Sequence, residues 1–161
     1  MILVTVGAQM PFDRLVQAVD AWAEATGRTG EVFAQIGEGG REPRHIAWTH
    51  FLEPDEFRRR LAEADVLVAH AGTGSIFSAL EFGIPVLVLP RHADKNETRN
   101  DHQIATAKRF EALGHVRVAW DESEVGPALE ALLSDAARSG CVAPHASPNL
   151  IAALADFVAS A

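Results

Sequence analysis

Several features that would indicate particular classes of protein are scarce in this chain of 161 residues. Its single cysteine, Cys141, excludes an internal disulfide and a cysteine-based zinc site. Its longest strongly apolar run, residues 84–90, is far shorter than the roughly 20 residues of a membrane-spanning helix. Residues 1–7 lack the basic start and the long apolar core of a signal peptide. We therefore expect a soluble, cytoplasmic protein without structural disulfides.

Positive charge is also scarce, because 14 Lys and Arg residues stand against 22 Asp and Glu residues, which gives a net charge of −8. Such an acidic balance argues against general binding to nucleic acid or to an anionic membrane face. The segment from Arg91 to Arg109 is nevertheless rich in cations and follows a glycine-rich turn. This local bias suits a small anionic ligand, and it equally suits the solvated face of a helix.

The chain alternates between short apolar runs and longer stretches with helical spacing. We expect strands at residues 2–6, 32–36, 45–52, 66–69, 85–89 and 115–119. We expect helices at residues 12–25, 54–64, 101–113 and 125–138, another that follows residues 70–75 and ends at residue 82, and a last one after Pro148. This alternation predicts an α/β fold: one Rossmann-like domain over residues 1–161, with a parallel sheet and helices on both faces. Ligands should bind beyond the carboxyl ends of its strands.

A glycine-rich turn at residues 70–75 follows a predicted strand and opens a helix, which is the context in which such a turn binds phosphate. Gly72 and Gly74 would allow positive φ and let a ligand approach the backbone amides. The hydroxyls of Thr73 and Ser75 would add hydrogen bonds. The other interpretation is a tight turn in which Ser75 only caps the helix. The chain has no GxGxxG fingerprint, P-loop or GxSxG elbow, so hydride transfer, ATP hydrolysis and serine hydrolysis lose support.

A second candidate region is the polar loop at residues 91–103, which separates a buried strand from the next helix. Long loops inside compact domains are usually functional or mobile. Its candidate ligand-binding side chains are Asn100, His102 and Gln103 for sugar hydroxyls, and Arg91 and Arg99 for phosphate. The alternative is a solvated loop whose Asp101 caps the next helix.

The seven histidines are too scattered for ordinary metal-ligand spacing, apart from His92 and His102 with Asp94 as a weak alternative. We therefore expect no bound metal. His70 ends a predicted strand, and three roles are open for it: a contact to a ligand, a catalytic base, or simply a polar strand end.

Four segments in a fixed order resemble one known family. Residues 70–75, 81–85 and 100–103 are similar to the C-terminal, nucleotide-sugar-binding half of family 28 glycosyltransferases. The opening residues 4–13 resemble one subgroup: small catalytic subunits of two-part enzymes, which make the second sugar of the dolichol-linked oligosaccharide in eukaryotes and exopolysaccharide in bacteria. The resemblance extends from residue 1 to about residue 115. It implies one of the two Rossmann-like halves of a GT-B glycosyltransferase, with a UDP-sugar as the donor.

The resemblance also implies roles for single residues. It places Gly7 in the first loop, near the donor phosphates. It places Gln103, with His102 before it, against the donor sugar. The residues that match the turn holding the diphosphate are His70, Gly72, Thr73, Gly74 and Ser75.

The chain departs from the family pattern at the residue that binds ribose. Many relatives carry a glutamate at the position of Ser78, whereas the acid in this chain is Glu81, one turn further along the same helix. Either residue could serve the ribose. The acceptor hydroxyl also needs a base, for which Asp13 and His70 are the candidates.

The function implied by the resemblance is an inverting, UDP-sugar-dependent hexosyltransferase that is active only with a second, membrane-associated subunit and transfers to a lipid-linked acceptor. The chain would lie at the inner face of the membrane, held there by this partner. The apolar helix expected between Asn149 and Ala161 could dock the partner, cover the sheet, or form a homodimer when the chain is alone. No cofactor is implied, because the UDP-sugar is a substrate. Two alternatives stay open: a non-catalytic nucleotide-binding or regulatory subunit, and an unrelated enzyme that binds FMN or NAD.

Overall fold

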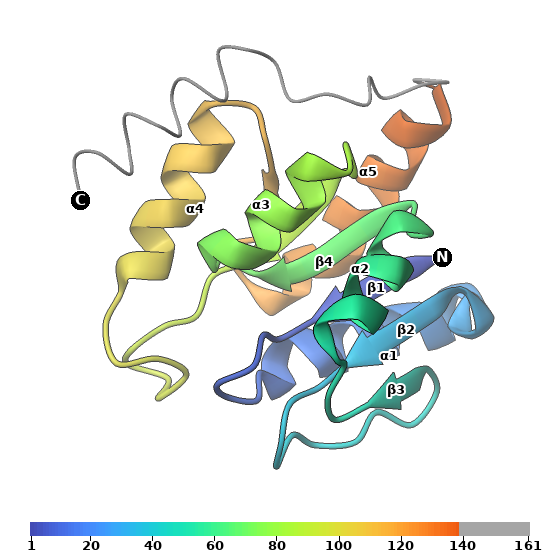
Figure 1. Cartoon of the computed structure of the whole chain (residues 1–161), viewed down its shortest axis with the longest axis horizontal. Helices are drawn as coiled ribbons and strands as arrows, with labels where there is room; N and C mark the ends of the chain where they lie inside the picture. The colour runs from blue at the N-terminus through green and yellow to red at the C-terminus, as the bar shows by residue number, and fades with distance from the viewer. Residues whose placement is uncertain (139–161) are drawn as a thin grey trace.

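A computed structural model describes residues 1–138 of the chain (Figure 1). Its centre is a sheet of six parallel strands. The strands are β1 (Ile2–Thr5), β2 (Val32–Gln35), β3 (Ala47–Thr49), β4 (Val66–His70), β5 (Val86–Leu89) and β6 (Arg117–Val118). The α/β class predicted from the alternation of apolar runs is confirmed.

The strand order of the sheet is β3-β2-β1-β4-β5-β6. In register, Val4 of β1 pairs with Ala34 on one side and with Val68 on the other. The chain runs outward from β1 to β3 and then returns to β4 on the other side of β1, so the direction of winding reverses between β1 and β4. Such a switch point leaves a crevice at the carboxyl ends of the two strands, where open α/β sheets bind their ligands.

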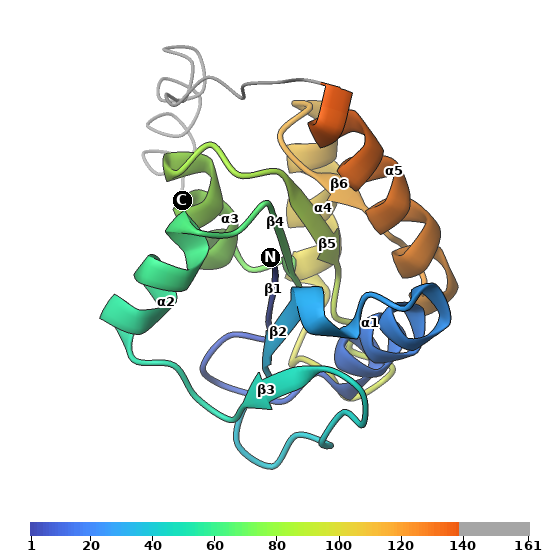
Figure 2. The same cartoon turned by 90° about the vertical axis from the view of Figure 1, so that its right-hand side faces the viewer.

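Helices cover both faces of the sheet. They are α1 (Asp13–Thr26), α2 (Pro54–Ala62), α3 (Thr73–Glu81), α4 (His102–Ala112) and α5 (Val125–Arg138), with short 3-10 turns η1 (Thr29–Glu31) and η2 (Glu122–Glu124). Figure 2 shows α1 and α5 together on one side of the sheet and α2 and α3 on the other. The alternation along β1 explains this arrangement, because Ile2 and Val4 pack with α1 and α5 while Leu3 packs with α2, α3 and α4.

Within residues 1–138, the expected elements are present in the expected order, and several are shorter than predicted. The third strand is confined to Ala47–Thr49 and the last to Arg117–Val118, because both lie toward the edges of the sheet and have fewer strand partners. The final helix expected after Pro148, and Cys141, lie outside the described residues. Within residues 1–138, no helix is both long enough and apolar enough to cross a membrane.

One buried carboxylate fixes the loop that leads into β3. Asp20 of α1 is 4% exposed and accepts hydrogen bonds from the backbone N–H groups of Arg44 (3.1 Å), His45 (2.9 Å) and Ile46 (3.1 Å). Burial alone would raise the pKa of Asp20, but these N–H groups and the His45 ring hold it below its ordinary value.

We expect Asp20→Asn to lower the free energy of unfolding by about 2 kcal/mol at pH 7, because the acceptor loses its charge and its new NH₂ group faces an N–H donor. The pKa of Asp20 is lower in the folded than in the unfolded chain, so its stabilisation is present above the unfolded pKa of about 3.9 and is lost as the pH falls through the folded pKa. Urea unfolding at pH 7 and at about pH 3 measures this. The control is Asp94→Asn, whose side chain is 80% exposed. A difference from wild type that stayed constant with pH would contradict the assignment.

Candidate functional site

The candidate site lies at the switch point of the sheet, where β1 and β4 end side by side. β1 leads into Gly7, and β4 ends at His70. The turn predicted to bind phosphate therefore opens at the crevice of the fold, next to the first glycine loop.

Helix α3 presents unpaired backbone amides at this crevice. The helix begins at Thr73. Its first N–H group that donates to a backbone carbonyl is that of Ile76, which donates to Gly72 (3.4 Å). Among the described residues, no side chain caps this end, so the amides of Thr73, Gly74 and Ser75 are left to bind an anion together with the helix dipole. The alternative in which Ser75 caps the helix is wrong, because Gly72 holds the cap position and Ser75 lies inside the first turn.

The two glycines of the turn do not use the positive φ that glycine allows. Neither Gly72 nor Gly74 has positive φ; Gly72 has a φ of −81°. Gly72 is needed for space, because a Cβ there would lie 2.1 Å from Cε1 of His70. Gly7 has a φ of +78°, and a Cβ on it would lie 2.7 Å from Nε2 of the same ring. Both glycines therefore make room for the imidazole, while Gly74 faces open space with no heavy atom within 4 Å.

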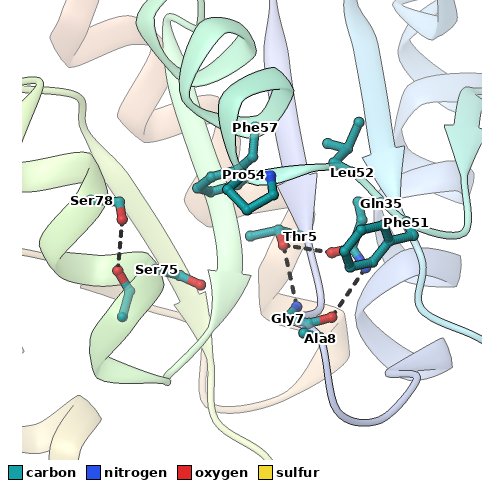
Figure 3. A pocket seen from close by; sticks show the side chains of 11 residues that line it. Thr5, Gly7, Ala8, Gln35, Phe51, Leu52, Pro54, Phe57, Ser75 and Ser78 are labelled. Atoms are coloured by element: carbon teal, nitrogen blue, oxygen red, sulfur yellow. Dashed lines mark hydrogen bonds between the residues drawn. The ribbon is translucent and has the colours of Figure 1, made fainter.

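A first pocket of about 380 Å³ lies on one side of Gly74. Figure 3 shows its apolar wall, formed by Phe51, Leu52, Pro54 and Phe57, opposite Ser75 and Ser78 of α3, with Gly7 and Ala8 at its edge. An apolar wall facing hydroxyl groups suits a flat ring joined to a polar sugar.

Two buried polar residues that the sequence analysis missed support this pocket. The Thr5 hydroxyl donates to Oε1 of Gln35 (2.7 Å) and accepts the N–H of Gly7 (3.2 Å). The Gln35 amide then donates to the carbonyls of Gly7 (3.1 Å) and His50 (3.1 Å). The pair fixes the glycine loop against the segment before α2. The sequence carried a signal for this pair, because each of the two neighbouring apolar strands has a polar side chain near its end.

A second pocket of about 390 Å³ lies on the other side of Gly74. The two pockets share Gly7, Ala8 and Gly74. Of the predicted site residues, the second pocket gathers Gly7, His70, Gly72, Thr73, Gly74, Arg91, His102 and Gln103. Asn100 lies outside both pockets, is exposed, and its Oδ1 interacts with His102.

His70 and Gln103 are in contact at the wall of the second pocket. The Nε2 atom of Gln103 lies 3.2 Å from Nδ1 of His70, and Gln103 is 5% exposed. Burial and the nearby charge of Arg91 lower the pKa of His70 to about 4. The imidazole is therefore neutral at physiological pH.

Arg91 makes its hydrogen bonds to the protein backbone, and its pairing with phosphate stays a prediction. It is 4% exposed, and its guanidinium donates to the carbonyl oxygens of Val6 (2.8 Å), Met10 (2.7 Å), Pro11 (2.8 Å) and Glu97 (3.0 Å). These contacts join the loop after β1 to the loop after β5. The Arg91 side chain lines the second pocket, so its positive charge lies close to the pocket surface. Its hydrogen bonds are nevertheless made to the protein.

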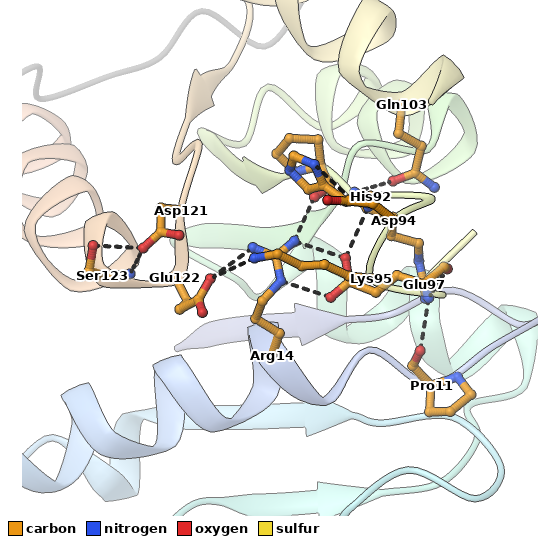
Figure 4. Close-up of polar contacts among 12 residues, drawn as sticks. Pro11, Arg14, His92, Asp94, Lys95, Glu97, Gln103, Asp121, Glu122 and Ser123 are labelled. Atoms are coloured by element: carbon orange, nitrogen blue, oxygen red, sulfur yellow. Dashed lines mark hydrogen bonds and ion pairs between the residues drawn. The ribbon is translucent and has the colours of Figure 1, made fainter. Parts of the chain in front are cut away.

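The loop after β5 is anchored at two further points. Figure 4 shows Arg14 of α1 between Glu97 and Glu122; it makes two contacts to the Glu97 carboxylate (2.8 and 2.9 Å) and one to Glu122 (3.0 Å). Asp101 accepts the N–H of Ala93 (2.9 Å) and does not cap α4 with its side chain, which corrects that alternative. Sequence analysis missed the pairing of Arg14 with Glu97 because 83 positions separate them.

The remaining predicted residues lie at different distances from the pockets. Ser78 lines the first pocket, whereas Glu81 does not; its side chain is 60% exposed and pairs with Arg58 (3.1 Å). Asp13 is exposed, accepts the N–H of Arg41 (2.9 Å), and lines neither of the two pockets. Across residues 1–138, no group of three His, Cys, Asp or Glu side chains is placed to hold a metal ion.

The family model described as the glycosyltransferase family 28 C-terminal domain matches residues 1–158. The chain is 29% identical over 138 residues to the UDP-N-acetylglucosamine transferase subunit ALG13 of Yarrowia lipolytica, covering 78% of this chain and 68% of that protein. It is 35% identical over 79 residues to the UDP-N-acetylglucosamine–N-acetylmuramyl-(pentapeptide) pyrophosphoryl-undecaprenol N-acetylglucosamine transferase of Geobacillus kaustophilus, covering 49% of this chain and 21% of that protein.

Among solved structures, MurG from Acinetobacter baumannii matches with a TM-score of 0.62 at 17% identity, over 99% of this chain and 49% of that one. This likeness shows the shared fold alone. The chain thus spans about half of the MurG chain and about a fifth of the Geobacillus enzyme. Because the family model covers nearly its whole length, the chain belongs to the glycosyltransferase family 28 C-terminal domain family.

Proposed function

We propose that this chain binds a UDP-sugar donor and forms the donor-binding half of a glycosyltransferase. One observation carries the proposal: two pockets meet at Gly7 and Gly74, beside the free amides at the start of α3. A nucleotide sugar has the same order of parts, with a diphosphate between a nucleoside and a sugar.

The proposed ligand lies across the crevice in one direction. Its diphosphate binds the amides of Thr73, Gly74 and Ser75, and its nucleoside fills the first pocket. There the apolar wall covers the base, and Ser78 is better placed than Glu81 to meet the ribose. The donor sugar fills the second pocket, next to His102 and Gln103.

This placement supplies what sugar transfer requires of the donor side. When the bond between the sugar and UDP breaks, negative charge accumulates on the leaving diphosphate. Fixed N–H groups and a helix dipole aimed at that position stabilise the charge without reorganising. The relatives' names mention UDP-N-acetylglucosamine, which makes this the first donor to test.

The acceptor side belongs to a second part of the enzyme in this proposal. We infer a membrane-associated partner subunit that contacts a lipid-linked acceptor and holds this chain at the inner face of the membrane. Two names support the inference: one relative is called a subunit, and the acceptor named for another contains pyrophosphoryl-undecaprenol. Docking through residues 149–161, and a homodimer in the partner's absence, remain predictions outside the described residues.

Thermal unfolding with a panel of ligands tests donor binding. We expect UDP and UDP-N-acetylglucosamine, at about 100 times their dissociation constants, to stabilise the chain by about 2.7 kcal/mol and to raise Tm by roughly 5–10 °C. GDP, FMN and NAD serve as comparisons. Protection by FMN or NAD but not by UDP would refute the proposal and favour the unrelated enzyme.

Transfer of radiolabelled N-acetylglucosamine to a lipid-linked acceptor separates the enzyme from a purely regulatory subunit. We expect transfer only when the partner is present with this chain. UDP binding without transfer in the complete complex would favour the non-catalytic alternative. Efficient transfer by this chain alone would overturn the two-subunit arrangement.

A further inference from the structure

We propose that Gln103 is a positioning residue that fixes the proton of His70 on Nε2, so that His70 offers a neutral N–H donor to an anionic ligand. The part that concerns the ligand rests on the proposed function. The part that concerns the proton rests only on contacts within the described residues.

The first step is the orientation of the Gln103 amide. The backbone N–H of Arg91 lies 3.2 Å from one end of that amide. A backbone N–H can only donate, so the atom that faces it is the oxygen Oε1. The NH₂ end of Gln103 must therefore point the other way.

The second step is the tautomer of His70. The NH₂ end of Gln103 lies 3.2 Å from Nδ1 of the ring. An amide NH₂ can only donate, so Nδ1 accepts and carries no proton in the neutral ring. The proton of the neutral imidazole is then on Nε2. Because Gln103 is 5% exposed, water has little access to compete for these contacts.

The third step is the position of the Nε2–H group. Nε2 has no hydrogen-bond partner among residues 1–138. Every buried polar side-chain atom in that part of the chain has a partner, so Nε2 is not buried. Nε2 is therefore open to the second pocket, which His70 lines. Gly7 and Gly72 pack so closely against the ring that it cannot rotate freely. The donor thus shares this pocket with the free amides of Thr73 and Gly74.

The surrounding charges keep the ring neutral. Burial, the Arg91 guanidinium and His102 all lower the pKa of His70. The Gln103 NH₂ group that faces Nδ1 also favours the neutral ring, because it donates to the nitrogen that a second proton would occupy. The other charged group that lines the second pocket is Glu97, whose carboxylate is held by Arg14. The loop after β1 and the first turn of α3 place no titratable side chain there. In this arrangement His70 has no free lone pair in the pocket, so the base for transfer comes from another group.

Nitrogen-15 NMR of the histidine rings in the full chain tests the proton position directly. His70 is assigned by the loss of its signals in His70→Gln. We expect wild type to show the Nε2–H tautomer with a pKa below 5. Gln103→Glu should move the proton to Nδ1 and raise the pKa, because a carboxylate accepts from both Arg91 N–H and the ring. Asn100→Asp, which adds a negative charge outside the contacts among Arg91, Gln103 and His70, should leave the tautomer unchanged.

Ligand binding is measured on the same variants. Added UDP or pyrophosphate should shift the wild-type Nε2–H signal, and Gln103→Glu should bind UDP at least about 10-fold more weakly than Asn100→Asp. An Nδ1–H tautomer in wild type, or an unchanged tautomer in Gln103→Glu, would overturn the positioning role. An altered tautomer with equal UDP affinity, or no Nε2–H shift with pyrophosphate, would overturn the donor role. Failure of wild type to bind UDP would instead refute the proposed function, while the tautomer is still decided by the free protein.

Discussion

Gly74→Val is expected to weaken UDP binding by at least about 100-fold, or about 2.7 kcal/mol, in a protein that still folds. Gly74 lines both pockets, and no heavy atom lies within 4 Å of the position of an added Cβ. The added Cβ therefore meets no protein atom, and we expect the valine side chain to occupy the path of the diphosphate to the amides of α3. Isothermal titration calorimetry measures the affinity, and circular dichroism confirms the fold.

Gly30→Val is the matched control, because Gly30 also faces open space and lies in η1, away from the crevice. It should bind UDP as wild type does. Normal UDP binding by folded Gly74→Val would show that the phosphate site is elsewhere, and the proposed placement of the ligand would then be wrong.

Arg91→Met is expected to lower the free energy of unfolding by at least about 3 kcal/mol, which corresponds to a fall in Tm of roughly 10 °C. The substitution keeps an unbranched apolar stem but leaves the carbonyls of Val6, Met10, Pro11 and Glu97 without their shared donor. The hydrogen bonds that are lost join two loops that border the second pocket, so UDP-sugar binding should weaken as well. Chemical unfolding and calorimetry on one preparation measure both effects.

Arg99→Met is the control, because Arg99 is an exposed arginine in the same loop. It should leave stability within about 0.5 kcal/mol of wild type, as surface substitutions usually do. If Arg91→Met lost UDP binding with unchanged stability, Arg91 would be a direct phosphate ligand, as the sequence analysis expected, and its structural role would be refuted.

The sequence was sufficient to predict the layers of the fold and the place of the site. Apolar runs such as residues 2–4 and 86–89 are continuous because a parallel strand is buried on both faces. The turn at residues 70–75 stands between a strand and a helix, and in a parallel sheet every such turn lies at the same edge. Local pattern and general topology therefore located the crevice without knowledge of any long-range contact.

The same local pattern was a poor guide to what individual side chains do. Conformational freedom and close approach of a ligand were the reasons considered for Gly72, but its role is to leave space for a ring two positions earlier in the chain. Arg91 was one candidate to pair with phosphate, and the pattern gave no sign that it binds carbonyl groups contributed mainly by residues 6–11. The Arg91 contacts join residues 80 to 85 positions apart, and no local window of the sequence contains both partners.

The sequence by itself thus determined the α/β class, the order of the elements and the edge that carries the glycine turn, because burial and backbone conformation act on neighbouring residues. Only the tertiary structure decided which polar groups meet there. Thr5 reaches Gln35 across 30 positions, and Gln103 reaches His70 across 33. Hydrogen bonds require partners within about 3 Å, and it is the folding of distant segments together that brings such atoms into range and fixes where each proton lies.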